Sequence, residues 1–441
     1  MKDGTVQVNL WGRLRAIISA DTFPGVLLVL LALVALVLAN SPLAENYFSW
    51  WQAEIKLGTW DIGLTCGEFI NDALMAVFFL MIGLEIKREI LVGELSSVKK
   101  AAFPVVAALG GMLIPALIYI IFNFSSADGS VSGFGIPMAT DIAFALGVLL
   151  LLGKRVPVAL KVLLLSLAVA DDLGAIIIIA VFYTTSLSWT YLLAAGATLL
   201  VLFVLNRLGV RSLVPYILLG LVVWFCFLHS GVHATIAGVL VALTVPFGMR
   251  LSAKQFAAKG APVMGSFEHN EDVTHSQLAE TLDKKSPLVH LQNGLHKPVY
   301  LFILPLFALA NAGVAFGGEG INLFSPVALG IMLGLLIGKP MGIMGFTWLA
   351  CRLRFLEKPK SLHWQQIGGM SMLGGIGFTM SIFITYLAFS DAAHVDSAKL
   401  AILIGSLIAG IIGTVYMLRI TKKPHKKKAV THSHEAEETA V

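Results

Sequence analysis

The chain is dominated by long apolar runs with short polar segments between them. A helix that crosses a bilayer needs about 20 mostly apolar residues. Twelve segments meet this requirement, and hydrophobic residues make up 57% of the 441-residue chain. Only 13% of the residues are charged, against about 25% in an ordinary soluble domain. The sequence therefore predicts an all-α integral membrane protein with a twelve-helix domain over residues 22–420. The segments are centred near Leu31, Ala76, Leu109, Phe144, Val169, Gly196, Leu219, Gly238, Leu306, Leu336, Phe378 and Ala409.

The positive charges predict how these helices are oriented. Of the 31 Lys and Arg residues, 27 fall at the two ends and in alternate loops, whereas the opposite loops are expected to hold only Lys56 and Lys399. Basic loops stay on the cytoplasmic side. We therefore expect both termini in the cytoplasm, with residues 1–21 as a polar N-terminal segment, 250–297 as a long cytoplasmic loop and 421–441 as a disordered tail. Because the cations are spread over short loops, the pI of 9.0 does not indicate a nucleic-acid partner.

Four charged residues lie within predicted membrane-spanning segments, where a charge has a high free-energy cost. Asp141, Asp171, Asp172 and Lys339 fall near the middle of segments four, five and ten. Unpaired, they would together cost on the order of 10 kcal/mol. One alternative is a buried ion pair that only holds helices together, but three acids exceed what one base requires. The surplus carboxylates favour a site for a hard cation such as Na⁺ or Li⁺, which takes oxygen ligands.

Asp171 and Asp172 cannot have the same role, because consecutive side chains on a helix diverge by about 100°. We expect Asp171 to meet Lys339 and Asp172 to line a water-filled cavity. Like-charge repulsion and desolvation favour the protonated form of at least one of them. The pair therefore predicts a site where a metal ion and protons compete.

Two segments carry signals of an interrupted helix. Segment four reads GIPMATDIAFALG, with Pro137 just before Thr140 and Asp141, and segment eleven has five glycines in GGMSMLGGIGFTMSIF before Thr379. Broken helices in corresponding halves of a chain are typical of transporter sites, although membrane helices also use glycine simply for packing. We expect Asp141 to offset the positive ends of the half-helices.

Segment two carries further acidic residues. Asp72 lies one turn from Glu68 in its outer half, and Glu85 and Glu89 lie beside basic residues at its cytoplasmic end. The latter two could form a mouth that attracts cations or senses pH, or an interfacial salt-bridge cluster; both readings stay open.

Several of these motifs together resemble the NhaA-type bacterial Na⁺/H⁺ antiporters. The similarity covers most of the apolar chain. It rests on INDALMAVFFLMIGLEIKRE, AAFPVVAALGGM, ATDIAFALG, LAVADDLGAIIIIAVFY, LPLFALANAGV, GLLIGKPMGI and GIGFTMSIFI.

The resemblance implies a fold with inverted repeats in which the broken helices four and eleven cross. It implies electrogenic exchange of Na⁺ or Li⁺ for a larger number of protons, in the bacterial inner membrane, for sodium and pH homeostasis. Asp171 and Asp172 would hold the ion and the protons, with Lys339 as partner of Asp171 and with Thr140 and Asp141 at the crossing. An outer hairpin within Leu43–Gly63 could support a homodimer in the lipid bilayer.

The chain departs from the family pattern before segment nine. The stretch HLQNGLHKPV keeps His296 but carries Gln292 and Asn293 where an acidic, histidine-bearing stretch linked to pH sensing is typical. We take His296, Glu85, Glu89 and Asp72 as the candidates for pH sensing or ion entry.

An intramembrane enzyme and a passive cation channel are the alternatives to a transporter. An intramembrane aspartyl protease needs aspartates in YD and GxGD contexts, and a prenyl transferase needs acidic pairs one turn apart, whereas this chain has DD. A passive cation channel needs an open pore, in which Lys339 would repel cations. We therefore expect a transporter that is not an enzyme and needs no cofactor.

Overall fold

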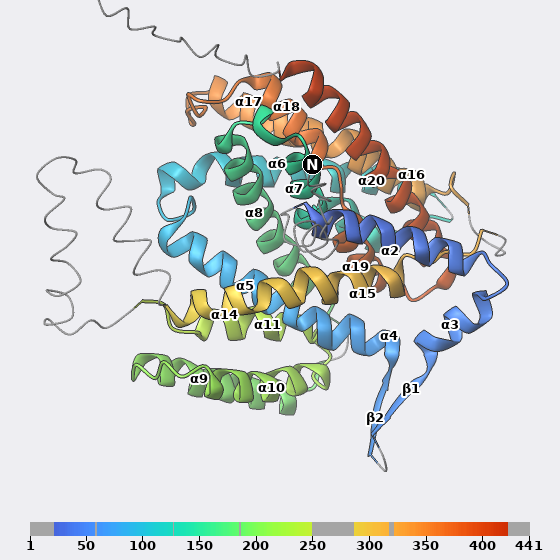
Figure 1. Ribbon diagram of the computed structural model, residues 1–441, viewed down its shortest axis with the longest axis vertical. Helices are drawn as coiled ribbons and strands as arrows, with labels where there is room; N and C mark the ends of the chain where they lie inside the picture. The colour runs from blue at the N-terminus through green and yellow to red at the C-terminus, as the bar shows by residue number, and fades with distance from the viewer. Residues whose placement is uncertain are drawn as a thin grey trace, which may run out of the picture.

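The computed structural model describes residues 22–57, 60–126, 128–184, 187–248, 286–316 and 322–421, which are almost entirely helical (Figure 1). The predicted N-terminal segment 1–21, residues 250–285 of the predicted loop and residues 422–441 of the predicted tail lie outside the described residues.

The first part of the chain contains a feature that an all-α prediction misses. Helix α2 (Phe23–Ala39) turns by 112° into α3 (Ala44–Gln52). An antiparallel hairpin of β1 (Glu54–Leu57) and β2 (Trp60–Thr65) follows. It falls in the stretch expected to hold an outer hairpin, and it makes the fold helical with one two-stranded sheet.

The following helices build the first half of the bundle. One continuous helical segment, Cys66–Val92, consists of α4 (Cys66–Glu68), the π-helix η1 (Phe69–Leu74) and α5 (Met75–Val92). The next elements are α6 (Val98–Asn123), the 3₁₀ helix η2 (Val131–Met138), α7 (Ile142–Leu151), the short η3 (Gly153–Arg155), α8 (Val158–Phe182), α9 (Trp189–Arg207), α10 (Val214–Leu228) and α11 (Thr235–Thr244).

The second half contains two more π-helical turns. The elements are α14 (Pro287–Pro298), the π-helix η4 (Val299–Ile303), α15 (Leu304–Asn311), α16 (Pro326–Leu333), the π-helix η5 (Gly334–Gly338), α17 (Lys339–Arg352), α18 (Trp364–Leu373), α19 (Phe378–Ala388) and α20 (Ala392–Ile420).

The helices identify a multi-pass membrane protein. Within the described ranges, seven helical segments are long and apolar enough to cross a bilayer, or up to nine if each of two bent pairs counts as one span. Every centre of the twelve predicted segments lies in a helix. Whether all twelve segments span stays a prediction.

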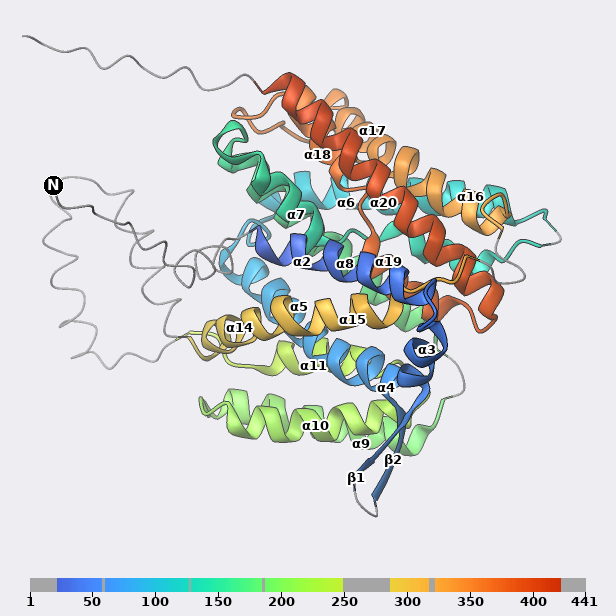
Figure 2. The ribbon, with the colours of Figure 1, turned by 45° about the vertical axis from the view of Figure 1, so that its right-hand side comes forward.

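The bundle has an edge layer and a central part. Figures 1 and 2 both show α9 and α10 as a layer at one edge, beside α11 and α14, with α17, α18 and α20 on the opposite side. Large apolar side chains on the edge layer are exposed, including Leu193 (70%) and Leu218 (59%). Helices α7, α8 and α19 lie in the central part, where the candidate site is found.

The closest helix contact positions Lys339. Helices α6 and α17 pack so tightly that a Cβ on Gly342 would overlap the Gly110 carbonyl oxygen. Small residues let helix backbones approach in this way. Lys339, the first residue of α17 and fully buried, is thereby held against the centre of the bundle.

The prediction that Lys399 lies in an outer loop is wrong. It belongs to α20 and is 7% exposed. Its ammonium donates to Asp396 at 3.3 Å and lies 5.0 Å from the centroid of the Tyr386 ring. These two contacts stabilise the lysine within a helix, at a position where the charge pattern predicted a loop.

Candidate functional site

Two helix interruptions meet at the centre of the bundle. Between η2 and α7 the backbone is extended at Ala139 (ψ 149°) and Asp141 (ψ 101°), and between α18 and α19 the helix bends by 50°. The backbone N–H of Asp141 donates to the carbonyl oxygen of Ile376 at 2.7 Å. Because the ends of helices leave backbone groups unpaired, each break supplies a partner for the other.

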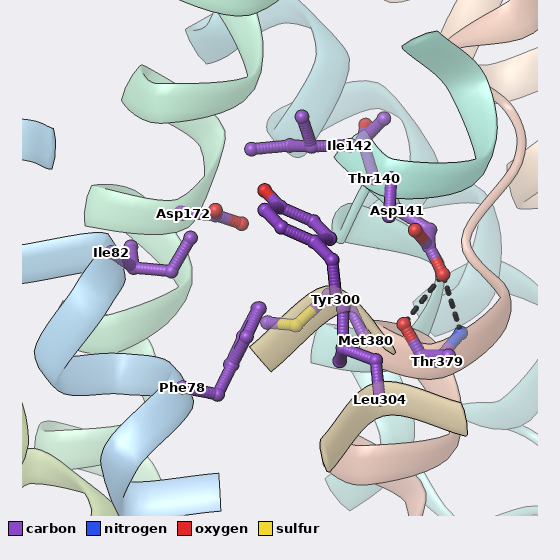
Figure 3. Close-up of a pocket in the computed structure, with 11 residues that line it drawn as sticks. Phe78, Ile82, Thr140, Asp141, Ile142, Asp172, Tyr300, Leu304, Thr379 and Met380 are labelled. Atoms are coloured by element: carbon purple, nitrogen blue, oxygen red, sulfur yellow. Dashed lines mark hydrogen bonds between the residues drawn. The ribbon is translucent and has the colours of Figure 1, made fainter. Parts of the chain in front are cut away.

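Asp141 accepts hydrogen bonds at the starts of two helices, and Figure 3 shows those at Thr379. One carboxylate oxygen accepts the Phe144 N–H at 2.9 Å and so caps α7. The other accepts the N–H of Thr379 at 3.1 Å and its hydroxyl at 2.5 Å, in the first turn of α19. A negative side chain is favoured at a helix N-terminus, and this one is 2% exposed.

Asp171 is part of a three-residue polar cluster. The Lys339 ammonium lies 2.6 Å from Asp171 Oδ2, and both side chains are fully buried. The Thr140 hydroxyl is 2.8 Å from the same carboxylate oxygen, accepts from the Lys339 ammonium at 2.6 Å and lies 3.0 Å from the Gly374 carbonyl oxygen. The cluster therefore joins both helix breaks to α8 and α17.

Asp172 points away from this cluster and has no hydrogen-bond partner in the part of the chain that the structure describes. It is 1% exposed, and among the described residues neither carboxylate oxygen is hydrogen-bonded, nor is Oδ1 of Asp171. A buried carboxylate without a partner is strongly unfavourable unless a cation or a proton neutralises it. The side chain lines a cavity of about 10 Å³, close to the 10–15 Å³ that a single water molecule needs on this scale.

The same cavity brings together the polar residues of the two breaks. Thr140, Asp141 and Thr379 line it with Asp172 and Tyr300, and apolar side chains from α5, α7, α15 and α19 complete the wall. Across the described residues, no group of three or more His, Cys, Asp or Glu side chains forms a metal site. A cation bound here would thus depend on few carboxylates and on neutral oxygens.

Comparison with known proteins decides the family. The family model for Na⁺/H⁺ antiporter 1 matches residues 15–417. The Na(+)/H(+) antiporter NhaA of Helicobacter pylori (strain G27) is 50% identical over 430 residues, which cover 94% of this chain and 97% of that protein. The chain belongs to this family.

A second relative agrees. The Na(+)/H(+) antiporter NhaA of Wolinella succinogenes is 48% identical over 427 residues, covering 93% of this chain and 94% of that protein. A solved structure of a sodium proton antiporter from Methanocaldococcus jannaschii has a TM-score of 0.48 and 13% identity, and the match covers 94% of this chain and 99% of that one. The resemblance stated from the motifs is confirmed, and the family is one of transporters rather than enzymes.

The acidic residues predicted at the ends of segment two lie apart from the cavity wall in this family member. Glu85 is half-buried, within electrostatic reach of Asp172, Arg88 and Glu89. Glu89 accepts the Glu94 N–H at 2.9 Å at the end of α5. Neither residue lines the cavity.

Lys87 and Asp72, which also belong to segment two, have local hydrogen-bond partners. Lys87 donates to the carbonyl oxygens of Leu243 and Val245, at 2.7 and 2.5 Å, and so closes the end of α11. Asp72 lies in η1, where its backbone carbonyl oxygen accepts the Trp224 indole N–H at 3.1 Å. The Asp72 side chain, like Glu89, is outside the cavity lining.

Two polar residues of the cavity wall, Thr379 and Tyr300, were not predicted as part of the site. Thr379 follows the glycine-rich break directly, so its position was a signal that sequence reasoning could have used. Tyr300 lies in an apolar run of segment nine and carries no such signal. The exposed His296, which was predicted as a possible sensor, packs its ring 4.6 Å from the ring of Tyr300.

Proposed function

We propose that this chain exchanges Na⁺ for protons across a membrane and that Asp171 and Asp172 carry the exchange. The observation that carries the proposal is Asp172, a carboxylate that is 1% exposed and without a hydrogen-bond partner among the described residues. Family membership supports sodium/proton antiport, because the relatives that match along their whole length are named Na(+)/H(+) antiporters.

The exchange follows from charge balance at the carboxylate. A protonated Asp172 is neutral, and an ionised Asp172 needs a cation beside it in the low-dielectric interior. When Na⁺ binds, the proton leaves to the side that the site faces, and when a proton binds, Na⁺ is released. When the two carboxylates together exchange two protons for one Na⁺, each cycle moves one net charge across the membrane. The exchange is therefore electrogenic.

Lys339 and Thr140 keep the second carboxylate in place. Their contacts with Asp171 Oδ2 leave only Oδ1 of that residue free for an ion. Li⁺, a smaller hard cation with the same preference for oxygen ligands, should compete with Na⁺ at these atoms.

The finer architecture is part of the same proposal. Twelve spans with inverted repeats would place the broken segments four and eleven across each other at mid-membrane depth. The hydrogen bond from Asp141 to Ile376 and the capping of both α7 and α19 by Asp141 support such a crossing. Asp141 would then neutralise two positive helix ends that are buried in the bundle.

The topology and surroundings are inferred from charge and exposure. The concentration of Lys and Arg in alternate loops supports cytoplasmic termini, with 250–297 and 421–441 on that side, in a bacterial inner membrane. The exposed apolar side chains of α9 and α10 would contact lipid. The β1–β2 hairpin is a candidate for pairing with a second copy, because a two-stranded sheet can be extended by a further strand at an edge.

We assign ion entry and pH response to the end of α5 and the start of segment nine. Glu85 is the best supported of the candidate residues because it is half-buried and within electrostatic reach of Asp172. Glu89, His296 and Asp72 lie outside the lining of the cavity, and their effect on transport would be indirect.

The test is transport in inverted membrane vesicles that hold an acid interior. Adding Na⁺ or Li⁺ should dissipate the gradient with the wild-type protein, and Asp172→Asn or Asp171→Asn should abolish the response. Asp128→Asn, the same chemical change at an exposed loop residue, is the matched control and should exchange normally. Unchanged exchange in Asp172→Asn would remove the site assignment.

A further inference from the structure

The side chain of Tyr300 reaches the acidic site from the π-helix η4, at the junction of α14 and α15. We propose that the Tyr300 hydroxyl is an oxygen ligand of the transported cation, next to the carboxylate of Asp172. The inference rests on the proposed exchange at Asp172, and it assigns a neutral ligand to that site.

The oxygens around the cavity leave few alternatives. Hard metal cations take about six oxygen ligands, and five residues of the wall have side-chain oxygens: Thr140, Asp141, Asp172, Tyr300 and Thr379. The Thr140 hydroxyl is occupied by Lys339 and Asp171, and the Thr379 hydroxyl by Asp141.

Asp141 is also engaged, since both of its oxygens accept hydrogen bonds from the first turns of α7 and α19. The remaining side-chain oxygens are the pair on Asp172, which has no partner in the described part of the chain, and the phenol oxygen of Tyr300. Every other residue of the wall is apolar or alanine. Tyr300 is therefore the neutral side-chain oxygen available to a cation held by Asp172.

The orientation of Tyr300 fits this role. Figure 3 shows its ring between Asp172 on one side and Asp141 with Thr379 on the other, with the hydroxyl oxygen turned to the Asp172 side. The hydroxyl is also within electrostatic reach of Asp172, Glu85 and Asp141. A phenol oxygen can contact a cation without adding charge, and its O–H can donate to the carboxylate when the cation has left.

The backbone explains why the ring is aimed inward. A π-helical turn inserts an extra residue into the helix and is frequent at functional sites. Pro298 and Pro305 flank this turn and lack the N–H of an ordinary helix. The His296 ring, in α14, packs against the Tyr300 ring with 4.6 Å between their centroids. This contact supports the Tyr300 ring on its α14 side.

The discriminating variant is Tyr300→Phe, which deletes one oxygen and keeps the ring. In inverted vesicles at fixed pH, the apparent KM for Na⁺ should rise about tenfold, as expected for losing one polar contact to a charged group, with maximal exchange within about twofold of wild type. Tyr216→Phe is the control. It deletes a hydroxyl that donates to the Val210 carbonyl oxygen at 3.1 Å on the edge layer, so its KM should stay unchanged.

A binding measurement completes the test. Na⁺ should raise the melting temperature of purified wild-type protein, and Tyr300→Phe should need about tenfold more Na⁺ for the same rise. An unchanged KM, or a lower maximal rate with unchanged KM and unchanged Na⁺ stabilisation, overturns the proposal and leaves a packing role for the ring.

The comparison with Asp172→Asn separates the two hypotheses. If Asp172→Asn abolishes exchange while Tyr300→Phe keeps the wild-type KM, the exchange site stands and the Tyr300 ligand is wrong. If Asp172→Asn still exchanges, the site itself is wrong.

Discussion

The buried pair of Lys339 and Asp171 gives a quantitative prediction about what holds the site together. Lys339→Met removes the ammonium and keeps an unbranched side chain of similar length. Asp171 then has only the Thr140 hydroxyl on its Oδ2, with both carboxyl oxygens still buried. Because breaking a fully buried pair leaves an uncompensated charge, the free energy of unfolding should fall by about 3–5 kcal/mol. Asp171→Asn, which leaves the ammonium unpaired, should cost about the same.

The double variant Asp171→Asn/Lys339→Met tests whether the cost arises from the pair. If the two residues acted independently, the losses would add to about 6–10 kcal/mol. Since replacing a whole buried pair by neutral groups is often nearly neutral, we expect the double variant to lose no more than about 2 kcal/mol. The interaction energy should thus be several kcal/mol.

The assay is denaturant unfolding of the purified protein in detergent micelles, followed by circular dichroism of the helices. The four proteins, wild type, two single variants and the double variant, form one cycle under identical conditions. A double variant that loses the full sum of the single losses would show that Lys339 and Asp171 do not depend on each other, contrary to the 2.6 Å contact.

Two further predictions concern the packing and the helix breaks. Gly342→Ala should lower the melting temperature and slow exchange, because its Cβ would overlap the Gly110 carbonyl oxygen and displace the helix that starts at Lys339; Gly345→Ala, in open space on the same helix, is the matched control for a thermal melt. Thr379→Val should cost about 1–3 kcal/mol in the same unfolding assay, since it removes a hydroxyl donor to the buried Asp141 carboxylate, and a loss no greater than that of Thr198→Val on the exposed face of α9 would contradict it.

Much of the fold can be predicted because placing a polar or charged group inside a bilayer costs free energy. Apolar runs of about 20 residues mark the helices, and the rare charges inside them mark the centre of the bundle. The structure places Asp171, Asp172 and Lys339 there. Asp171 meets Lys339, and Asp172 is turned away from it, because consecutive side chains on a helix diverge. Pro137 lies beside the first break, and Gly374, Gly375 and Gly377 lie in the second. Gly368 and Gly369 lie within α18.

The parts that could not be predicted depend on local departures from regular helices. The π-helical turns η1, η4 and η5 shift the register of the residues that follow them, so a period of 3.6 residues does not give the direction of Tyr300. A tyrosine in an apolar run also has no large insertion cost that would single it out. Lys399 was misplaced because its contact with the Tyr386 ring, on α19, forms only in the folded bundle. Its ion pair with Asp396, by contrast, is local to α20.

The central claim is that a metal cation and protons compete for the same carboxylate. Its most direct test is the apparent KM for Na⁺ in inverted vesicles at a series of pH values, with the membrane potential held constant. Competition predicts that this KM rises as pH falls, by about tenfold per pH unit where one carboxylate takes up a proton and up to about a hundredfold where both do, while saturating Na⁺ restores the maximal rate. A KM that stays constant while only the maximal rate changes with pH would contradict the account.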